Sequence, residues 1–135
     1  MIVAPVKRKT QKITQFYNGI RHRGIDLRSV SHLTWSKHKI IVCEDSVIKR
    51  MGRDGYGNGF IVLEPLESDY DEIKYIHVDI RNPFWQIGSA IFGGDVLGYT
   101  EIAGNSKAHH LHFEVWRKTH VNPLQYFNKF DIGYV

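Results

Sequence analysis

Short runs of β-branched and aromatic residues dominate the hydrophobic pattern of this chain. Few windows place apolar residues at helical spacing, whereas apolar runs recur between turn signals such as Gly57-Asn58-Gly59 and Gly93-Gly94-Asp95. Many short strands at close spacing are typical of all-β folds. We therefore predict one all-β domain over residues 1–135, a compact antiparallel sheet, sandwich or barrel. Strands are expected at 12–17, 24–29, 39–44, 46–52, 60–65, 73–80, 89–93, 95–100 and 110–116.

The segment HHLHFEVW, residues 109–116, alternates as a strand with one buried face. Successive side chains of a strand point to opposite sides. The apolar side chains expected to face the core are Leu111, Phe113 and Val115. His110 and His112 share the opposite face with Glu114 and Trp116, so both imidazoles can point toward the same place.

A second cluster, HRGID, combines His22 and Asp26, four residues apart. Taken alone, this pair is more readily explained as a surface ion pair. Together with His112, however, it supplies two imidazoles and one carboxylate, and catalytic zinc sites hold the metal with three protein ligands and one open position. Such a metal lowers the pKa of its bound water to about 7. A closed structural site is less favoured, because the chain has one cysteine.

Two more histidines could move protons beside this metal. His110 lies on the same strand face as His112. In IKYIHVDI, residues 73–80, alternation predicts that Tyr75, His77 and Asp79 share one face, which would make His77 a second proton donor or an oxyanion stabiliser. Without the other clusters, His77 would be interpreted as a solvent-facing histidine. The remaining histidines, expected on the surface, are His32, His38, His109 and His120.

The expected metal and proton chemistry predicts a pH profile. Zinc binding needs neutral imidazoles and an ionised carboxylate, so activity should be weak at about pH 5 and rise through neutrality. Loss of a needed proton from His77 or His110 should lower the activity again at alkaline pH, which gives a bell-shaped profile.

Composition narrows the class of protein. Hydrophobic residues at 42% and charged residues at 24% are ordinary for a globular protein and argue against disorder or membrane insertion. The single cysteine, Cys43, excludes an intramolecular disulfide. No apolar segment follows a basic start at the N-terminus, which predicts a chain made in the cytoplasm without a signal peptide. The net charge of +4 favours anionic partners, although a solvated basic face is the simpler explanation.

The order of the motifs resembles the lysostaphin-type zinc endopeptidases of bacterial cell walls. The resemblance runs from Ile13 to Phe127 through ITQFY, HRGID, GYGNGFIVLEP, YIHVD, GDVLGYTEIAGNSKAHHLHFEVW and VNPLQY. It implies a compact antiparallel, barrel-like β-fold with zinc in a groove. It also implies that His22, Asp26 and His112 bind zinc, that His110 is a catalytic base or stabiliser, and that His77 assists at the oxyanion.

The resemblance implies one Zn²⁺ per chain and cleavage of peptide bonds in peptidoglycan. The chain departs from the family in the short segment between Phe16 and His22 and at Ser46, where glycine is usual, so the shape of the groove and the choice among peptidoglycan bonds stay open. With no signal or wall-binding segment visible, we expect a bacteriophage lysis (endolysin) or tail-associated enzyme, with the oligomeric state open and a monomer favoured.

Two other classes compete with this interpretation. One is a non-catalytic relative that keeps the fold as a cell-wall-binding or phage structural module. The other is a basic nucleic-acid-binding β-barrel, in which Tyr56, Tyr75 and Trp116 would stack on bases. No strand shows the dense alternation of basic and aromatic residues that nucleic-acid binding would need, so no nucleic-acid partner is expected.

Overall fold

The computed structural model describes residues 4–6, 11–29, 37–81 and 83–127, and its regular structure is almost entirely β. The strands are β1 (Gln11–Gln15), β2 (Ile25–Ser29), β3 (Lys39–Ile41), β4 (Ser46–Arg53), β5 (Gly59–Pro65), β6 (Glu72–Ile76), β7 (Ala90–Ile91), β8 (Val96–Tyr99), β9 (Leu111–Arg117) and β10 (Thr119–Val121). A 3-10 turn, η2 (Pro123–Gln125), follows them. Within these residues no helix is long and apolar enough to cross a bilayer.

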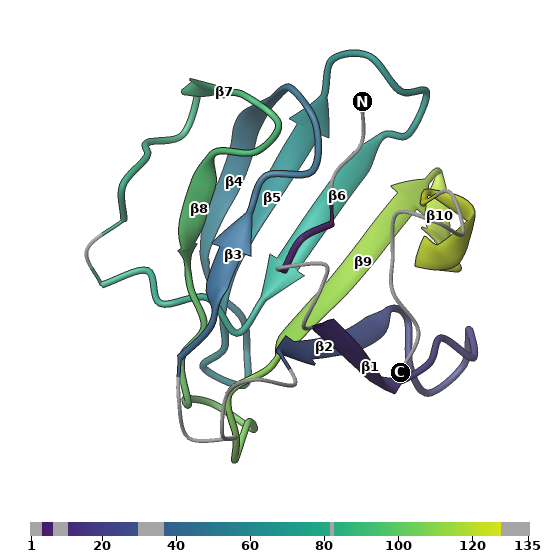
Figure 1. Cartoon of the computed structure of the whole chain (residues 1–135), viewed down its shortest axis with the longest axis vertical. Helices are drawn as coiled ribbons and strands as arrows, with labels where there is room; N and C mark the ends of the chain where they lie inside the picture. Colours follow the sequence, from purple (N-terminus) through teal and green to yellow (C-terminus); the bar gives the residue numbers. More distant parts are fainter. Residues whose placement is uncertain (1–3, 7–10, 30–36, 82, 128–135) are drawn as a thin grey trace.

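The strands form one large and one small antiparallel sheet (Figure 1). The large sheet has the order β1-β2-β9-β6-β5-β4-β7, and β10 pairs with the C-terminal end of β9. The small sheet consists of β3 and β8. The predicted all-β antiparallel class is therefore confirmed. The expected strands at 39–44, 89–93 and 95–100 are shorter than predicted.

The core lies between the two sheets. Tyr75 of β6 and Phe113 of β9 are both fully buried, and their ring centroids are 5.2 Å apart. The Tyr75 hydroxyl donates to the carbonyl oxygen of Ile41 at 3.2 Å, which joins β6 to the small sheet. The three residues expected to face the core from residues 110–116 are each 0% exposed: Leu111, Phe113 and Val115.

Strand β6 ends earlier than the alternating pattern predicts. It stops at Ile76, and His77 has a left-handed backbone with φ of 73°. The cause is the carbonyl oxygen of Gly59, which accepts from the amides of both His77, at 2.9 Å, and Val78, at 3.1 Å. A Cβ at position 59 would lie 2.0 Å from the carbonyl oxygen of Val78, so only glycine allows this approach.

The early end of β6 overturns the predicted faces of residues 75–79. Tyr75 points into the core, whereas Ile76 and His77 both line the cavity described below. Asp79 instead pairs with Arg81 outside that cavity. The prediction that Tyr75, His77 and Asp79 share a face is therefore wrong, because the left-handed residue breaks the period of two.

Candidate metal centre

The pairing of β2 with β9 brings the first two side chains of the site together. Asp26 lies directly opposite His112 in this antiparallel pair. Opposed side chains in such a pair are close neighbours, so the carboxylate and the imidazole meet. Gly24 makes the approach possible, because a Cβ there would lie 2.2 Å from the carbonyl oxygen of Phe113. The glycine of HRGID is therefore needed for the site to form.

A side-chain-stabilised turn before β2 places His22. The side-chain oxygen of Asn18 accepts hydrogen bonds from the amides of Ile20, Arg21 and His22, at 2.9, 2.8 and 3.1 Å. The Nδ1 of His22 also lies 3.0 Å from the carbonyl oxygen of Phe16. These contacts fix both the backbone and the ring of His22, and its Nε2 is left to point toward β2.

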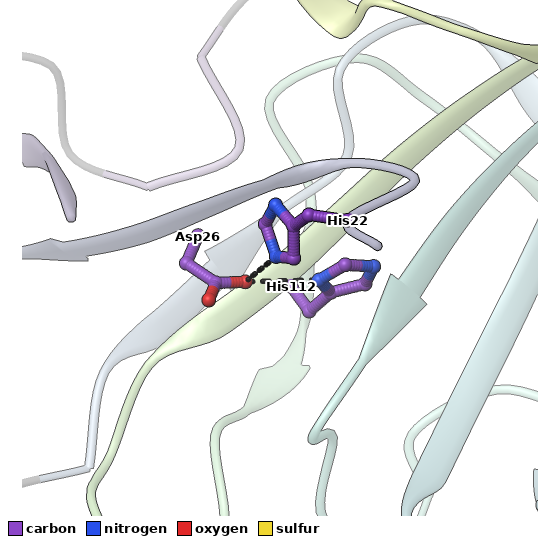
Figure 2. A group of neighbouring side chains, drawn as sticks. All are labelled: His22, Asp26 and His112. Atoms are coloured by element: carbon purple, nitrogen blue, oxygen red, sulfur yellow. Dashed lines mark hydrogen bonds and ion pairs between the residues drawn. The ribbon is translucent and has the colours of Figure 1, made fainter. Parts of the chain in front are cut away.

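His22, Asp26 and His112 converge on one point (Figure 2). Their potential ligand atoms all lie within 4.8 Å of one another. The Oδ1 of Asp26 is 3.1 Å from the Nε2 of His22 and 2.9 Å from the Nδ1 of His112. The three side chains that the sequence singled out as a ligand set are thus brought together within the described part of the chain.

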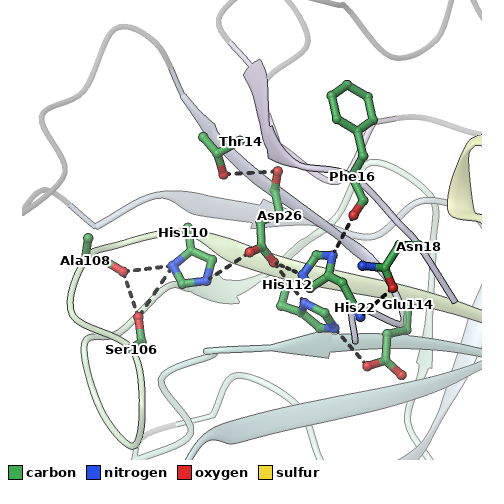
Figure 3. A network of polar contacts seen from close by, with 10 residues as sticks. All are labelled: Thr14, Phe16, Asn18, His22, Asp26, Ser106, Ala108, His110, His112 and Glu114. Atoms are coloured by element: carbon green, nitrogen blue, oxygen red, sulfur yellow. Dashed lines mark hydrogen bonds and ion pairs between the residues drawn. The ribbon is translucent and has the colours of Figure 1, made fainter. Parts of the chain in front are cut away.

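The contacts of both imidazoles suit a metal. A backbone carbonyl can only accept, so the Phe16 carbonyl requires a proton on the Nδ1 of His22, and the Nε2 of His22 is the nitrogen that faces Asp26. The Nε2 of His112 lies 2.8 Å from Oε2 of Glu114, which leaves its Nδ1 toward Asp26 (Figure 3). Metal-bound histidines almost always donate their second N–H to such an acceptor. The donor set therefore fits a divalent metal of the zinc type.

The electrostatics of the metal-free site also favour a cation. Burial lowers the pKa of His112, but its hydrogen bonds to Asp26 and Glu114 outweigh burial and raise the pKa to about 9. Burial raises the pKa of Asp26, but the hydrogen bond from His112 and the other nearby imidazoles hold it below its usual value. A positive charge is therefore stable between two carboxylates at neutral pH.

His110 and His77 lie beside this set rather than in it. The Nδ1 of His110 is 3.0 Å from the carbonyl oxygen of Ala108, so its Nε2 is the free nitrogen, 3.9 Å from Oδ2 of Asp26 (Figure 3). The rings of His110 and His77 have centroids 4.5 Å apart. Burial, together with the neighbouring His110 and His112, lowers the pKa of His77 to about 4. His77 is therefore neutral at pH 7.

These side chains share one cavity of about 530 Å³. Its wall contains all five residues predicted to act in the site, together with two arginines, Arg21 and Arg23, and the aromatic ring of Tyr56. A larger hollow of about 730 Å³ lies elsewhere, lined by the ion pairs Arg53–Glu101 and Arg81–Asp79. The candidate ligand set, His22, Asp26 and His112, belongs to the smaller cavity, which we take as the candidate site.

Some expectations for individual histidines fail. His38 is buried, not on the surface, with 2% of its area exposed. His109 is half-buried with its Nδ1 3.0 Å from Oγ1 of Thr100, and His120 is half-buried with its Nδ1 3.1 Å from the Tyr17 hydroxyl. His32 lies outside the described residues. The sequence did not indicate that Glu114 holds the Nε2 of His112, although it placed Glu114 on the same polar face.

Comparison with known proteins gives the class of fold. No family model matches the sequence, and no curated protein matches it. Solved structures do match. A zinc-containing peptidase from Vibrio cholerae is 22% identical with a TM-score of 0.73, over 90% of this chain and 38% of the peptidase. The catalytic domain of lysostaphin from Staphylococcus simulans is 22% identical with a TM-score of 0.62, over 84% of this chain and 86% of that domain.

A third match comes from the SpoIIQ–SpoIIIAH pore-forming complex. It is 16% identical with a TM-score of 0.74, and it covers 95% of this chain and 91% of the matched chain. The protein therefore has the fold of the lysostaphin-type peptidases, as the sequence motifs predicted. Because the chain spans 38% of the Vibrio cholerae peptidase, and all three identities are low, activity and substrate are matters for proposal.

Proposed function

We propose that this protein is a zinc-dependent endopeptidase that hydrolyses peptide bonds in bacterial peptidoglycan. The observation that carries the proposal is the convergence of His22, Asp26 and His112, in which each imidazole has its far nitrogen held by a separate acceptor. This arrangement has three protein ligands and faces a cavity, as catalytic zinc sites do. When bound there, zinc would act as a Lewis acid and make water nucleophilic at neutral pH.

His110 and His77 would then have different roles, the first in proton transfer and the second in hydrogen bonding. His110 keeps its Nδ1 proton on the Ala108 carbonyl, so its free Nε2 can accept a proton from the attacking water and return it to the leaving amine. His77 is neutral at pH 7, so it would donate a hydrogen bond, rather than a proton, to the oxygen that gains charge. Both rings line the same cavity as the ligand set.

The choice of peptidoglycan as substrate rests on the motifs and on the fold. The motif order from Ile13 to Phe127 resembles the cell-wall endopeptidases, and the lysostaphin domain, described as an antimicrobial peptidase, shares the fold. All five positions that carry chemistry in that family are filled here, by His22, Asp26, His77, His110 and His112. These observations favour a bacteriolytic enzyme.

A second candidate function is a non-catalytic module in a protein assembly. The similarity to a chain of the SpoIIQ–SpoIIIAH pore-forming complex, with a TM-score of 0.74, favours it. The complete ligand set and the two further histidines favour the peptidase. Zinc content and turnover separate the two, because an assembly module needs neither.

The test is digestion of purified peptidoglycans of several cross-link types by the zinc-loaded protein. The new amino and carboxyl termini would be identified by mass spectrometry, with Asp26→Ala as the metal-deficient control. We expect new peptide termini with the wild-type protein and none with the variant. A folded protein that holds no zinc after zinc addition, or that releases no termini from any peptidoglycan, would refute the proposal.

A further inference from the structure

We infer that the candidate site selects peptides with a free carboxylate beside the scissile bond, and that Arg21 and Arg23 bind this carboxylate. The inference rests on the proposed peptidase function and adds the substrate class. It favours stem-peptide cross-links, such as D-alanyl linkages, over glycine-rich bridges, whose residues carry no side-chain charge.

The two arginines flank a metal-ligand candidate and line its cavity. Arg21 and Arg23 stand one residue to either side of His22, and all three side chains belong to the cavity wall. The side chain of Asn18 holds this turn through the amides of Arg21 and His22. A carboxylate bound by these arginines would therefore be held close to the ligand set.

Both guanidinium groups are available to a ligand. Arg21 and Arg23 are exposed, and neither side chain has a hydrogen-bond or ion-pair partner among the residues that the structure describes. Four other arginines are engaged in ion pairs, namely Arg50 with Glu72, Arg53 with Glu101, Arg81 with Asp79, and Arg117 with Asp69. Arg28 of β2 is likewise unpaired among the described residues, but it does not line the cavity. The candidate site therefore has two unpaired guanidinium groups in its wall.

The three carboxylates of the cavity wall form no ion pair with these arginines. Asp54 accepts hydrogen bonds from the amides of Tyr56, at 2.9 Å, and Asn58, at 3.0 Å. Asp26 and Glu114 both hold His112. A bound zinc would add further positive charge. No carboxylate of the described residues is paired with either arginine, and a carboxylate on a peptide substrate is a group that guanidinium binds through paired charge-assisted hydrogen bonds.

The experiment compares two synthetic cross-linked peptides that differ at one group beside the scissile bond, a carboxylate in one and the carboxamide in the other. We expect zinc-loaded protein to cleave the acid with a kcat/KM about 10-fold or more above that of the amide, the usual scale for a hydrogen bond to a charged group. In the double variant Arg21→Gln, Arg23→Gln this ratio should fall toward one. Arg50→Gln removes one positive charge outside the cavity and should keep the wild-type ratio.

Binding is measured separately, so that the inference and the proposed function can fail independently. Calorimetry of zinc-loaded His110→Ala with each peptide should show the same preference for the acid, and the preference should disappear when Arg21→Gln and Arg23→Gln are added. Equal cleavage of acid and amide, or a preference unchanged in the double variant, would overturn the inference and leave the peptidase standing. Acid-selective binding without cleavage by the wild-type protein would support the carboxylate site and refute the peptidase. If the protein neither bound nor cleaved either peptide, both would be refuted.

Discussion

The Nε2 of His112 lies 2.8 Å from Oε2 of Glu114, two residues further along the same strand. Glu114 is itself held by the indole N–H of Trp116, which donates to its Oε1 at 2.9 Å. Glu114 is buried, with 6% of its area exposed. The polar face of β9 therefore carries a continuous chain of contacts from Trp116 to the nitrogen of His112 that faces Asp26. This chain fixes the orientation and basicity of one expected metal ligand.

Glu114→Gln should weaken zinc binding without abolishing it. The amide can still accept from the Nε2 of His112, but the negative charge that favours a cation is lost. Partners of metal-bound histidines typically change metal affinity by about 10- to 100-fold, and we expect a loss of about 10-fold, measured by competition with a chelator. Glu64→Gln, at an exposed position of β5, is the matched control and should bind zinc as the wild type does. Unchanged affinity in Glu114→Gln would remove the role assigned to this carboxylate.

Zinc binding should release close to one proton from His112 at pH 7. Because its pKa is about 9, the imidazole of His112 is protonated at pH 7 before the metal binds, and the metal must displace that proton. The apparent affinity for zinc should rise with pH up to about 9. Above this pH, His112 is already neutral and zinc binding releases no proton from it. Calorimetry in buffers of different ionisation enthalpy measures the number of protons. Release of no proton at pH 7 would show that His112 is neutral before the metal binds.

Local periodicity predicts the features of the site that depend on one strand. Leu111, Phe113 and Val115 are buried as alternation requires, and His110, His112 and Glu114 share the opposite face. The buried and polar faces of such a strand can be assigned from its sequence, because side chains alternate strictly and the face that joins the core must be apolar. Glu114 was placed correctly on that face, although nothing in the pattern indicated its hydrogen bond to His112.

Contacts between distant segments could not be derived in the same way. Asp26 and His112 are 86 residues apart in sequence, and their contact depends on the register between β2 and β9. Spacing alone left His22 and Asp26 as a surface ion pair. The prediction of a shared site came from the count of three zinc ligands that His112 completes, and the motif order agreed with it. The different faces of Tyr75, His77 and Asp79 were missed because the carbonyl of Gly59 accepts two amides, which no hydrophobic pattern records.

His77→Gln should make the metal-free protein less sensitive to acid. Burial and neighbouring imidazoles lower the pKa of folded His77 to about 4, whereas an unfolded histidine titrates near 6.5. Between these values the unfolded chain binds a proton that the folded chain does not, so the free energy of unfolding falls as pH drops from about 6.5 through about 4. Urea unfolding across this range should show a shallower fall in His77→Gln than in the wild type. Identical slopes in the two proteins would contradict the lowered pKa.

The same pKa corrects the expected pH profile of activity. His77 is already neutral at pH 7, so loss of its proton cannot cause an alkaline fall in activity. Any alkaline limb must come from another group, and His77→Gln should leave the position of that limb unchanged while it lowers turnover.

His110→Ala and His112→Ala should separate proton transfer from metal binding. His110 lies outside the converging ligand set, so His110→Ala should keep zinc while turnover falls by about 10²-fold or more, the usual scale for general acid–base catalysis. His112→Ala should lose both zinc and turnover. Metal analysis after dialysis, together with peptide cleavage, distinguishes the two variants. If His110→Ala lost the metal and His112→Ala retained it, the two roles would be reversed.

Gly24→Ala should destabilise the protein and weaken its metal site together. The added Cβ would lie 2.2 Å from the carbonyl oxygen of Phe113, a backbone atom that cannot turn aside, so β2 must move away from β9. We expect a loss of about 1–3 kcal/mol in the free energy of unfolding, the usual cost of overpacking. Because the same strand pair places Asp26 opposite His112, zinc affinity should fall as well.

Gly55→Ala is the matched control for this effect, because a Cβ at that position would have nothing within 4 Å. Urea midpoints measured with and without zinc report both consequences. In the wild type and in Gly55→Ala, zinc should raise the midpoint, since it binds only the folded chain. In Gly24→Ala the midpoint without zinc should be lower and the increase on adding zinc smaller. A Gly24→Ala protein with wild-type midpoints under both conditions would show that the close approach of β2 to β9 does not control the site.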